Sequence, residues 1–416
     1  MIKSRWNKAK LVQMTRMKIL ITSQHYWPET FQITEIAESL AARGHEVTVL
    51  TGLPNYPKGV IPDEYLHGKN RHQVQNGVTI ERCFLIPRGK NTLSLAVNYY
   101  SFSHSATKLA RRLPEDFDVV FANQTSPVLM TKPGVEYAKI HNVPLVIYCC
   151  DLWPESMKVI LNNNFQLLFN HYKKVSCNLY SRATAIAVQS PAFIDYFEQV
   201  HGLPREMFYY IPHFSTGVAQ VAKYTEHEGV NFLVAGNIGR AQDMQTLLEA
   251  VAGMNHKSGF KLHIVGEGPC LQTSIDYVSE AGIDDRVIFH GRKPNNEMAS
   301  FNNMADAFIL TLDGSSWVGT TIPSRLQGYM SAGKPVLAAI NGGARMVIEE
   351  SACGAAVDAG NSAGLSRLMD DFMDNPAAYA TCGKNGREYY EKEFSKDKCI
   401  SDIENLLAKL VKGANL

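Results

Sequence analysis

Apolar residues recur along the chain in two alternating patterns, short continuous runs and longer stretches at helical spacing. The first run covers residues 18–22, and apolar side chains between 33 and 41 then recur every three or four positions. Gly44 stands where such a helix would end, and a second apolar run covers 45–51. Because this β-α-β order repeats, the sequence predicts an α/β protein whose parallel sheets are covered on both faces.

The apolar runs fall into two groups. The first group predicts strands at 18–22, 45–51, 78–86, 118–123, 144–150, 183–189 and 208–211, and the second at 231–235, 261–265, 286–290, 307–312, 335–339 and 354–357. We therefore expect two doubly wound, Rossmann-like domains, 17–213 and 228–394, which face each other across a cleft with a hinge near residue 220. A last helix at 397–411, within 395–416, could cross back to the first domain.

Composition narrows the class of protein. The 41 basic and 40 acidic residues nearly cancel, so no overall field attracts nucleic acid, and we expect no nucleic-acid partner. The eight cysteines show no C-x-x-C spacing, which favours reduced thiols in the cytoplasm over metal or disulfide frameworks. No apolar run approaches the ~18 residues of a membrane-spanning helix. The first sixteen residues carry five basic residues and no acid, and translation could start at Met1 or Met17.

The first candidate for chemistry is a glycine-rich turn between a strand and a helix. Gly236-Asn237-Ile238-Gly239-Arg240 follows the strand at 231–235 and precedes an amphipathic stretch at 243–254. Glycines let the backbone approach a phosphate, a helix N-terminus offers unpaired N–H groups, and Arg240 adds a charge. The motif suits a diphosphate, although glycine turns also close ordinary strand-to-helix connections.

Three more loops of this kind end strands of the second domain. Gly266-Glu267-Gly268 follows one strand, Arg292 and Lys293 follow the next, and Ser324 and Arg325 open a helix. The glycines could serve only a tight turn, and Ser324 could only cap its helix. Because the carboxyl ends of parallel strands share one edge, the four loops and their cations together predict a nucleotide site in this domain.

The first domain offers acids and aromatic residues at its own strand ends. Asp151 follows the strand at 144–150, with Glu155 in the same loop, and an acid there can accept a proton from an incoming hydroxyl. Asp151 could equally cap the helix that begins near Pro154.

The loop after the first strand and an acidic tripeptide are further candidates. The loop holds His25, Tyr26, Trp27 and Glu29, whose rings could stack on a sugar or a lipid-linked diphosphate, or pack between the domains. Asp116 and Asp118 form a D-x-D tripeptide before a strand, at the end of the sheet away from ligands, so we assign no metal site there.

Two sets of motifs resemble one known family. "IPSRLQGYMSAGKPVLAAINGGARMVIEESACG", "VAGNIGRAQ", "IVGEGP" and "ADAFILTL" are similar to the donor domain of retaining glycosyltransferases of family 4, which have the GT-B fold. "ITSQHYWPET", "LAARGHEVTVLTGLPNYPKG" and "YCCDLWPES" resemble the acceptor half of its bacterial surface-polysaccharide branch, which builds O-antigen, capsule or exopolysaccharide units. The resemblance spans roughly residues 17–390.

The resemblance implies transfer of a sugar from a nucleotide diphosphate, with UDP expected, the anomeric configuration retained, and no metal or other cofactor. By position, Gly239 and Arg240 would hold the diphosphate, the 292–294 backbone would meet the base, and Ser324 and Arg325 would lie near the phosphates. The acceptor would be a polyisoprenyl-diphosphate saccharide. The enzyme would then be cytoplasmic and peripheral to the inner face of the membrane, where a helix around 91–113 mixes apolar residues with cations.

Two departures from the family pattern affect the site. Many relatives carry a lysine where this chain has Gln242, and paired glutamates where it has Thr320 and Gly328. A ribose contact from Gly328 is therefore not assigned, and the acid that faces the sugar stays open. Two alternatives follow, a GT-B-like sugar-nucleotide epimerase that needs no acceptor, and a catalytically silent nucleotide-binding subunit.

Overall fold

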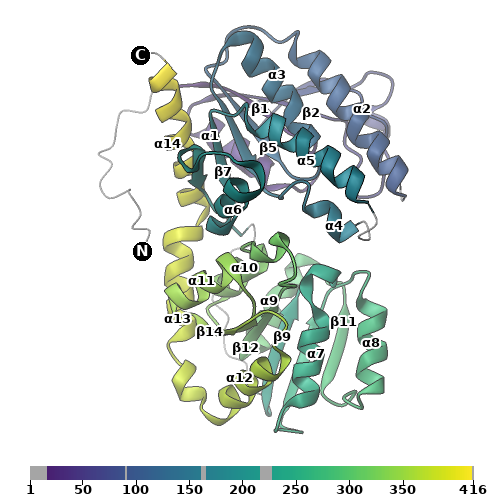
Figure 1. Cartoon of the computed structure of the whole chain (residues 1–416), viewed down its shortest axis with the longest axis vertical. Helices are drawn as coiled ribbons and strands as arrows, with labels where there is room; N and C mark the ends of the chain where they lie inside the picture. The colour runs from purple at the N-terminus through teal and green to yellow at the C-terminus, as the bar shows by residue number, and fades with distance from the viewer. Residues whose placement is uncertain (1–15, 90, 161–164, 216–226, 415–416) are drawn as a thin grey trace. The chain divides into compact units, whose positions relative to one another are not determined.

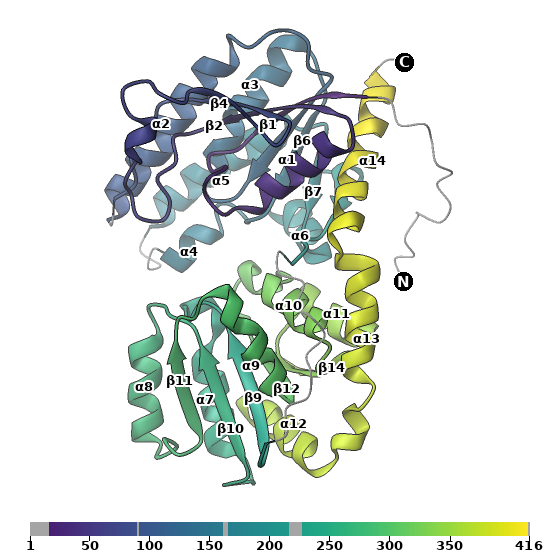
Figure 2. The same cartoon turned by 180° about the vertical axis from the view of Figure 1, so that it is seen from behind.

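The computed structural model describes residues 16–89, 91–160, 165–215 and 227–414, and these build two separate α/β sheets (Figures 1 and 2). The basic leader, except Arg16, and the predicted hinge near residue 220 lie outside the described residues. The chain divides into two compact units. We call them the N-terminal unit (Met1–Cys150, Lys174–Ala187 and Ile400–Leu416) and the C-terminal unit (Asp151–Lys173 and Val188–Cys399).

The first sheet has eight strands in the order β3-β4-β2-β1-β5-β6-β7-β8. They are β1 (Lys18–Thr22), β2 (Glu46–Thr51), β3 (His72–Gln75), β4 (Val78–Arg82), β5 (Val119–Gln124), β6 (Leu145–Cys149), β7 (Ala185–Val188) and β8 (Phe208–Tyr210). β1 pairs in parallel with β2 on one side and β5 on the other, with Leu20 opposite Thr48 and Val120. The predicted strand at 78–86 was too long, because pairing within the sheet ends at Arg82.

The sequence analysis missed β3, which also makes the first sheet mixed instead of wholly parallel. β3 pairs antiparallel with β4, and Asn76 and Gly77 join the two strands with φ of 48° and 81°. An Asn-Gly pair with positive φ at both positions is the favoured two-residue hairpin turn. Because the strand HQVQ is mostly polar and exposed, it gave no apolar run.

Helices of the N-terminal unit cover this sheet with an apolar face, and they are α1 (Gln32–Ala42), α2 (Thr92–Ala110) and α3 (Lys132–His141). α5 (Gln166–Tyr180) ends in the same unit, whereas α4 (Ser156–Ile160) and α6 (Pro191–Tyr196) belong to the C-terminal unit. In α1, residues Ile33, Ile36 and Leu40 are buried, as their spacing predicts. Asn91 is the N-cap of α2, and its side chain accepts a hydrogen bond from Ser94 N at 2.8 Å.

The second sheet has the order β11-β10-β9-β12-β13-β14 (Figure 2). Each strand lies within one residue of its predicted bounds: β9 (Val230–Ala235), β10 (Phe260–Val265), β11 (Val287–Gly291), β12 (Ala307–Thr311), β13 (Val336–Ala339) and β14 (Gly354–Val357). Every described pairing in it is parallel. This α/β sheet and the N-terminal one confirm the predicted fold class.

Two apolar clusters sandwich the second sheet. The first cluster includes Leu247 of α7 (Met244–Gly253) and Leu365 of α12 (Ser362–Asp374), with α8 (Leu271–Glu280) packed on the same face. The second includes Leu326 of α10 (Ser324–Ala332) and Val347 of α11 (Gly342–Ser351), with α9 (Met298–Met304) beside them. Burial of these helices on opposite faces makes the sheet doubly wound.

The last helix, α14 (Lys396–Ala414), follows α13 (Cys382–Tyr389) and ends within the N-terminal unit. There Glu404 is buried and accepts hydrogen bonds from Arg43 Nη1 and His45 Nε2, each at 2.7 Å. His45 Nδ1 accepts from Met17 N at 3.2 Å, so this histidine is the Nε2-protonated, neutral tautomer. Among the described helices, none is both long enough and apolar enough to span a membrane.

Candidate functional site

A pocket of about 530 Å³ opens at the carboxyl ends of β9, β10 and β11, next to the first turns of α10. Seven of the predicted binding residues line it: Gly236, Asn237, Gly266, Glu267, Arg292, Lys293 and Arg325. The other residues around it are Ser215, Ala235, Val265, Met298, Asn302, Gly328 and Tyr329. The structure thus brings residues of all four predicted loops to one cavity within the C-terminal unit.

Two glycine loops of the pocket pack backbone against backbone. Gly236 N donates to Val265 O, and Ile238 N donates to Glu267 O, both at 2.9 Å. A Cβ atom at Gly266 would lie 1.8 Å from Gly236 O, and one at Gly268 would lie 2.2 Å from Ile238 O. Glycine is therefore required at these positions by the neighbouring loop, whatever the pocket binds.

Arg325 fixes the glycine loop after β9 from the side of α10. Its Nη2 donates to Asn237 O at 3.1 Å, and a Cβ atom at Gly236 would lie 3.3 Å from that same nitrogen. Gly236 has φ of +130°, a conformation that other residues rarely adopt. The guanidinium thus sits over bare backbone at the edge of the pocket.

The charges of the pocket suit an anion. Arg292, Lys293 and Arg325 form no ion pair with any described residue, and Glu267 is the one acid among the described lining residues. Three cations against one carboxylate leave a positive potential in a concave site, which attracts anions such as phosphates. The same excess of cations does not suit a divalent metal, because Mg²⁺ needs carboxylate or other oxygen ligands.

Tyr329 holds the end of β9 in place beneath the pocket. Its hydroxyl accepts from Ala235 N at 2.9 Å and lies 3.3 Å from Ala235 O, where it donates. The ring stacks on Phe308 with centroids 4.1 Å apart. Burial raises the pKa of Tyr329, so the phenol stays protonated and keeps both hydrogen bonds at neutral pH.

Gly239 and Arg240 lie apart from this pocket. They line a second pocket of about 200 Å³, with Asp243, Cys270 and Thr273 among its other residues. Gly239 N donates to Gln242 Oε1 at 3.0 Å, and Asn237 Nδ2 donates to the same oxygen at 3.3 Å. Gln242, which replaces the family lysine, therefore closes the loop on itself. The diphosphate-binding role of Gly239 and Arg240 stays a prediction.

Ser324 is the first residue of α10 and is exposed, but it does not line the pocket. The N-cap is Pro323, and no side chain caps this helix, so the alternative that Ser324 acts as the cap is wrong. Thr320, at the position of the family's first glutamate, donates from Oγ1 to Trp317 O at 2.7 Å and does not line the pocket.

Sequence reasoning did not propose Ser215, Met298, Asn302 or Tyr329 as pocket residues. Gly328 and Tyr329 lie three and four positions after Arg325, so they share its helix face. That spacing could have predicted from the sequence that Gly328 and Tyr329 face the same pocket as Arg325. Ser215, Met298 and Asn302 come from other segments, and only the folded chain brings them to the pocket.

Comparison with known proteins identifies the family. Residues 31–214 match the model described as "Glycosyltransferase Family 4", and residues 220–389 match "Glycosyl transferases group 1". The chain belongs to the family 4 glycosyltransferases. The predicted enzyme class is therefore confirmed, and the donor of this glycosyltransferase is a nucleotide sugar.

Relatives and solved structures cover nearly the whole chain. N-acetyl-alpha-D-glucosaminyl L-malate synthase of Bacillus anthracis is 23% identical over 90% of this chain and 91% of its own. The probable glycosyltransferase WbjE of Pseudomonas aeruginosa is 24% identical over 71% and 76%. The Anabaena protein HepE, solved in complex with UDP and glucose, is 18% identical, with a TM-score of 0.68 over 95% of this chain and 100% of its own. The glycosyltransferase therefore has the GT-B fold.

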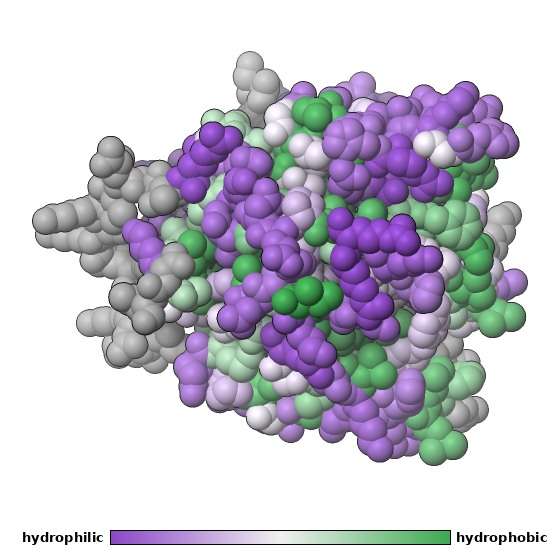
Figure 3. Space-filling model, turned by 90° about the horizontal axis from the view of Figure 1, so that it is seen from above, coloured by the Kyte–Doolittle hydropathy of each residue, from purple (hydrophilic) through white to green (hydrophobic). Residues whose placement is uncertain are grey.

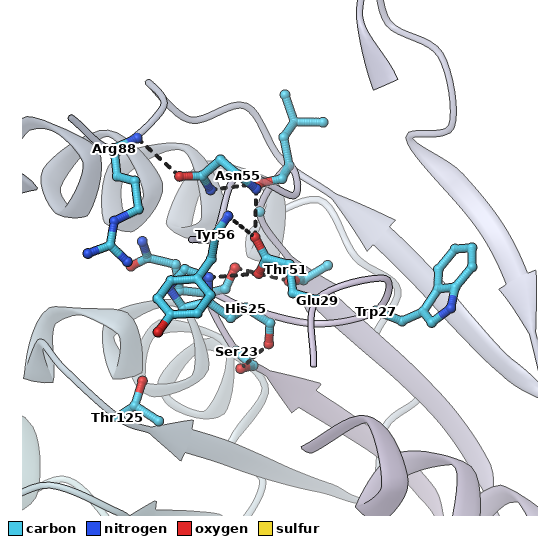
Figure 4. A network of polar contacts seen from close by, with 12 residues as sticks. Ser23, His25, Trp27, Glu29, Thr51, Asn55, Tyr56, Arg88 and Thr125 are labelled. Atoms are coloured by element: carbon cyan, nitrogen blue, oxygen red, sulfur yellow. Dashed lines mark hydrogen bonds and ion pairs between the residues drawn. The ribbon is translucent and has the colours of Figure 1, made fainter. Parts of the chain in front are cut away.

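In the N-terminal unit of the glycosyltransferase, a buried polar cluster lies at the carboxyl ends of β1 and β2 (Figure 4). His25 Nδ1 and Glu29 Oε2 are 2.7 Å apart, and both side chains are buried. Glu29 Oε1 accepts from the backbone nitrogens of Asn55 and Tyr56, each at 2.6 Å. Glu29 therefore holds the 52–59 loop, which contains the exposed Tyr56, against the loop after β1.

Aromatic rings and a cation surround this cluster. The His25 ring stacks on Phe31 with centroids 4.8 Å apart, and Tyr56 meets both rings edge-on. Arg88 lies 4.9 Å from the centre of the Tyr56 ring. Trp27 points away from these residues in Figure 4. The guanidinium of Arg82 lies 6.0 Å from the centre of the Trp27 ring.

The two acids predicted as catalytic lie in the C-terminal unit. Glu155 is buried, and its Oε2 lies 2.7 Å from Lys158 Nζ in an ion pair. Asp151 is half-buried in the turn before α4. The catalytic role of both acids stays a prediction.

The D-x-D tripeptide lies at the amino end of β1. Asp118 Oδ2 accepts from Lys18 N at 2.7 Å, and Asp116 Oδ2 forms an ion pair with Lys18 Nζ at 2.9 Å. Lys18 thus contacts both carboxylates. This pairing explains the two acids structurally, and we propose no metal site there.

Proposed function

We propose that the glycosyltransferase moves a hexose from a UDP-sugar to a polyisoprenyl-diphosphate-linked saccharide during bacterial surface-polysaccharide assembly. The transfer would retain the anomeric configuration and need no metal. The observation that carries the donor side is the pocket in which Arg292, Lys293 and Arg325 outnumber the single acid, Glu267. An anion with two or more negative charges fits such a site. The sugar donors of this family carry a nucleoside diphosphate, which is such an anion.

The pocket suggests how the donor lies. We expect the diphosphate beside the bare backbone of Gly236 and Asn237, within reach of Arg325. Each hydrogen bond to a charged phosphate contributes about 1.5 to 3 kcal/mol, so three or four suffice for micromolar affinity. The base would then lie toward Arg292 and Lys293. UDP is supported by the structural similarity to HepE, which was solved with UDP and glucose.

An exposed apolar strip supports a lipid-linked acceptor. We define the α2 surface as Phe84, Ile86, Leu93, Val97 and Tyr100, which are all exposed. Hydrogen bonds from Ile86 N to Ser101 Oγ at 2.9 Å and from Asn98 Nδ2 to Ile86 O at 2.6 Å tie the loop before α2 to that helix. Figure 3 shows hydrophobic atoms along its right-hand edge, the side on which Figure 1 draws α2.

The charges next to the α2 surface favour an anionic membrane. α2 contains no acidic residue, and Lys108 continues the face that carries Leu93, Val97 and Tyr100. Basic and apolar side chains on one helix face are typical of peripheral attachment to anionic lipids. We therefore place the glycosyltransferase at the inner face of the cytoplasmic membrane, where a polyisoprenyl acceptor would be available.

The polar cluster of Figure 4 could receive the saccharide end of that acceptor. Exposed Tyr56 offers a ring for stacking, Arg88 offers a cation, and buried Glu29 holds both in position through Asn55 and Tyr56. Among the acids, Asp151 and Glu155 remain our candidates to accept the proton of the incoming hydroxyl. The ion pair with Lys158 makes Glu155 the weaker candidate.

One experiment separates this function from its alternatives. Purified enzyme is incubated with UDP-, GDP- or dTDP-sugars and a polyprenyl-linked saccharide extract, with and without EDTA. Our proposal expects an α- or β-linked product of unchanged anomeric configuration, from a UDP-sugar, at the same rate in EDTA. An altered sugar in reactions without acceptor would instead indicate the epimerase, and UDP binding without any turnover would indicate the silent subunit.

The membrane part of the proposal has its own test. Leu93→Ser with Tyr100→Ser should reduce sedimentation with vesicles of phosphatidylethanolamine and phosphatidylglycerol several-fold. Ile275→Ser, at an exposed residue of α8 in the C-terminal unit, is the matched control and should sediment as the wild type does. Equal sedimentation of all three proteins would contradict the α2 surface as the membrane contact.

A further inference from the structure

α10 runs along one side of the nucleotide pocket. Arg325, Gly328 and Tyr329 line the pocket from one face of this helix. With a rise of 1.5 Å per residue, Gly328 lies about 4.5 Å beyond Arg325 along the helix axis. For a nucleotide whose diphosphate meets Arg325 and whose base reaches Arg292 and Lys293, we expect the ribose to pass over Gly328.

The pocket has open space at that point. A Cβ atom at Gly328 would meet no other atom within 4 Å, and glycine itself offers no side chain to a ribose. By contrast, Cβ atoms at Gly236 and Gly266 would meet Arg325 and the backbone. Glycine at 328 is therefore not demanded by packing, and its effect is to leave that wall of the pocket bare.

The described residues of α10 that line the pocket include no acid. Nucleotide sites that select ribose commonly place a carboxylate on its 2′-hydroxyl. The one acid among the described lining residues, Glu267, lies in the loop whose backbone contacts Gly236 and Ile238, where we expect the diphosphate. A site discriminates strongly against a missing hydroxyl only when it leaves a buried partner unpaired, and Gly328 has no side chain that could be such a partner.

We propose that the pocket accepts 2′-deoxyribonucleoside diphosphates about as well as ribonucleoside diphosphates. The donor class would then include dTDP-sugars as well as UDP-sugars. This inference rests on the proposed nucleotide site, and it adds that Gly328 sets the tolerance for the sugar of the nucleotide. It concerns the 2′-hydroxyl alone, since selection between bases depends on other residues of the pocket.

The test uses two ligands that differ only in the 2′-hydroxyl. UDP and dUDP are titrated into the full-length enzyme by calorimetry in buffer with EDTA. We expect dissociation constants that differ less than fivefold, and a difference of fivefold or more would overturn the inference. If neither ligand binds, the nucleotide site itself fails, which is a distinct result from a preference for UDP.

Substitutions at 328 locate the ribose. Gly328→Glu should raise the preference for UDP over dUDP about tenfold, because a charged acceptor can reach the 2′-hydroxyl through open space. The new carboxylate repels the diphosphate of both ligands equally, so this repulsion does not change the ratio of the two dissociation constants. Gly328→Gln, of equal length and without charge, should shift the preference less, and Gly328→Ala should leave it unchanged.

Two results at this stage would contradict the proposal. One is an unchanged preference in Gly328→Glu when circular dichroism shows the native fold, since the ribose would then lie elsewhere. The other is a wild-type preference for UDP that disappears in Glu267→Gln, which would assign ribose recognition to Glu267.

Discussion

Arg325 donates a hydrogen bond from Nη2 to the carbonyl oxygen of Asn237, at 3.1 Å. The contact joins the first turn of α10 to the loop after β9 and holds the guanidinium over Gly236. A cation already fixed at the pocket edge needs no reorganisation when a diphosphate arrives. Arg325 therefore orders the loop after β9 as well as contributing charge to the pocket.

Replacing Arg325 should weaken donor binding. We expect Arg325→Ala to raise the dissociation constant for UDP by roughly ten- to a hundredfold, because it removes a charged donor worth about 1.5 to 3 kcal/mol. Calorimetry measures this directly. Arg367→Ala, at an exposed arginine of α12 outside the pocket, is the control and should bind as the wild type does. Equal affinity in both variants would remove Arg325 from the donor site.

Arg240 should act on turnover more than on UDP affinity. It lines the smaller pocket, so Arg240→Ala should change the UDP dissociation constant less than about twofold. If Arg240 meets the leaving group during transfer, the barrier should rise by about 3 to 4 kcal/mol, as in sites that lose one preorganised donor. Steady-state kinetics with a saturating donor test this expectation. A loss of kcat below fivefold would count against Arg240.

Gly266 should be essential for stability even without ligand. Gly266→Ala places a Cβ atom 1.8 Å from Gly236 O, and relief of that clash should cost about 2 to 3 kcal/mol of unfolding free energy. Urea denaturation followed by circular dichroism measures the change. Gly413→Ala, where a Cβ atom would meet nothing within 4 Å, should be neutral. The same stability in both variants would contradict the close packing of the two glycine loops.

His263 should make the protein less stable in acid. Burial, together with the nearby His290, lowers its pKa to about 4. The unfolded chain takes up a proton below its ordinary pKa near 6.5, whereas the folded chain does not until about pH 4. The free energy of unfolding should therefore fall as the pH drops through this window, by roughly 2 to 3 kcal/mol for this residue.

The comparison variant for this pH effect is His263→Gln. His201 and His213, whose pKa values burial lowers to about 4 and about 3, remain in both proteins. The difference between the two stability profiles therefore isolates His263. Urea denaturation at about pH 7 and about pH 4.5 should show a smaller loss in the variant. Parallel profiles would indicate that His263 is not protonated differently in the folded and unfolded chain.

The sequence predicted most of the sheets because their strands are continuous apolar runs. β9 to β14 each lie within one residue of expectation, whereas polar β3 was missed and is marked only by Asn76-Gly77. The strand at 78–86 was extended too far, because Cys83 and Leu85 are buried in a loop that follows the sheet. Apolar runs report burial, and burial also occurs outside strands.

The pocket contains those predicted residues whose position the backbone alone decides. Gly236, Gly266 and Arg325 reach the cavity because their loops end neighbouring strands or begin the adjacent helix. The direction of Arg240 depends on how Gln242 folds the loop onto Gly239 N, and that contact carries no signal in a strand-turn-helix pattern. Residues contributed by distant segments, such as Ser215, were beyond the reach of local spacing.

The most direct test of the account is the binding of UDP to the C-terminal pocket in the absence of divalent ions. Titration calorimetry of UDP into the full-length enzyme in EDTA should give micromolar affinity, unchanged when Mg²⁺ is added, and strongly weakened by Arg325→Ala. No detectable heat with UDP or any other nucleoside diphosphate, or binding that appears only with Mg²⁺, would contradict the claim that backbone and cationic side chains hold the donor.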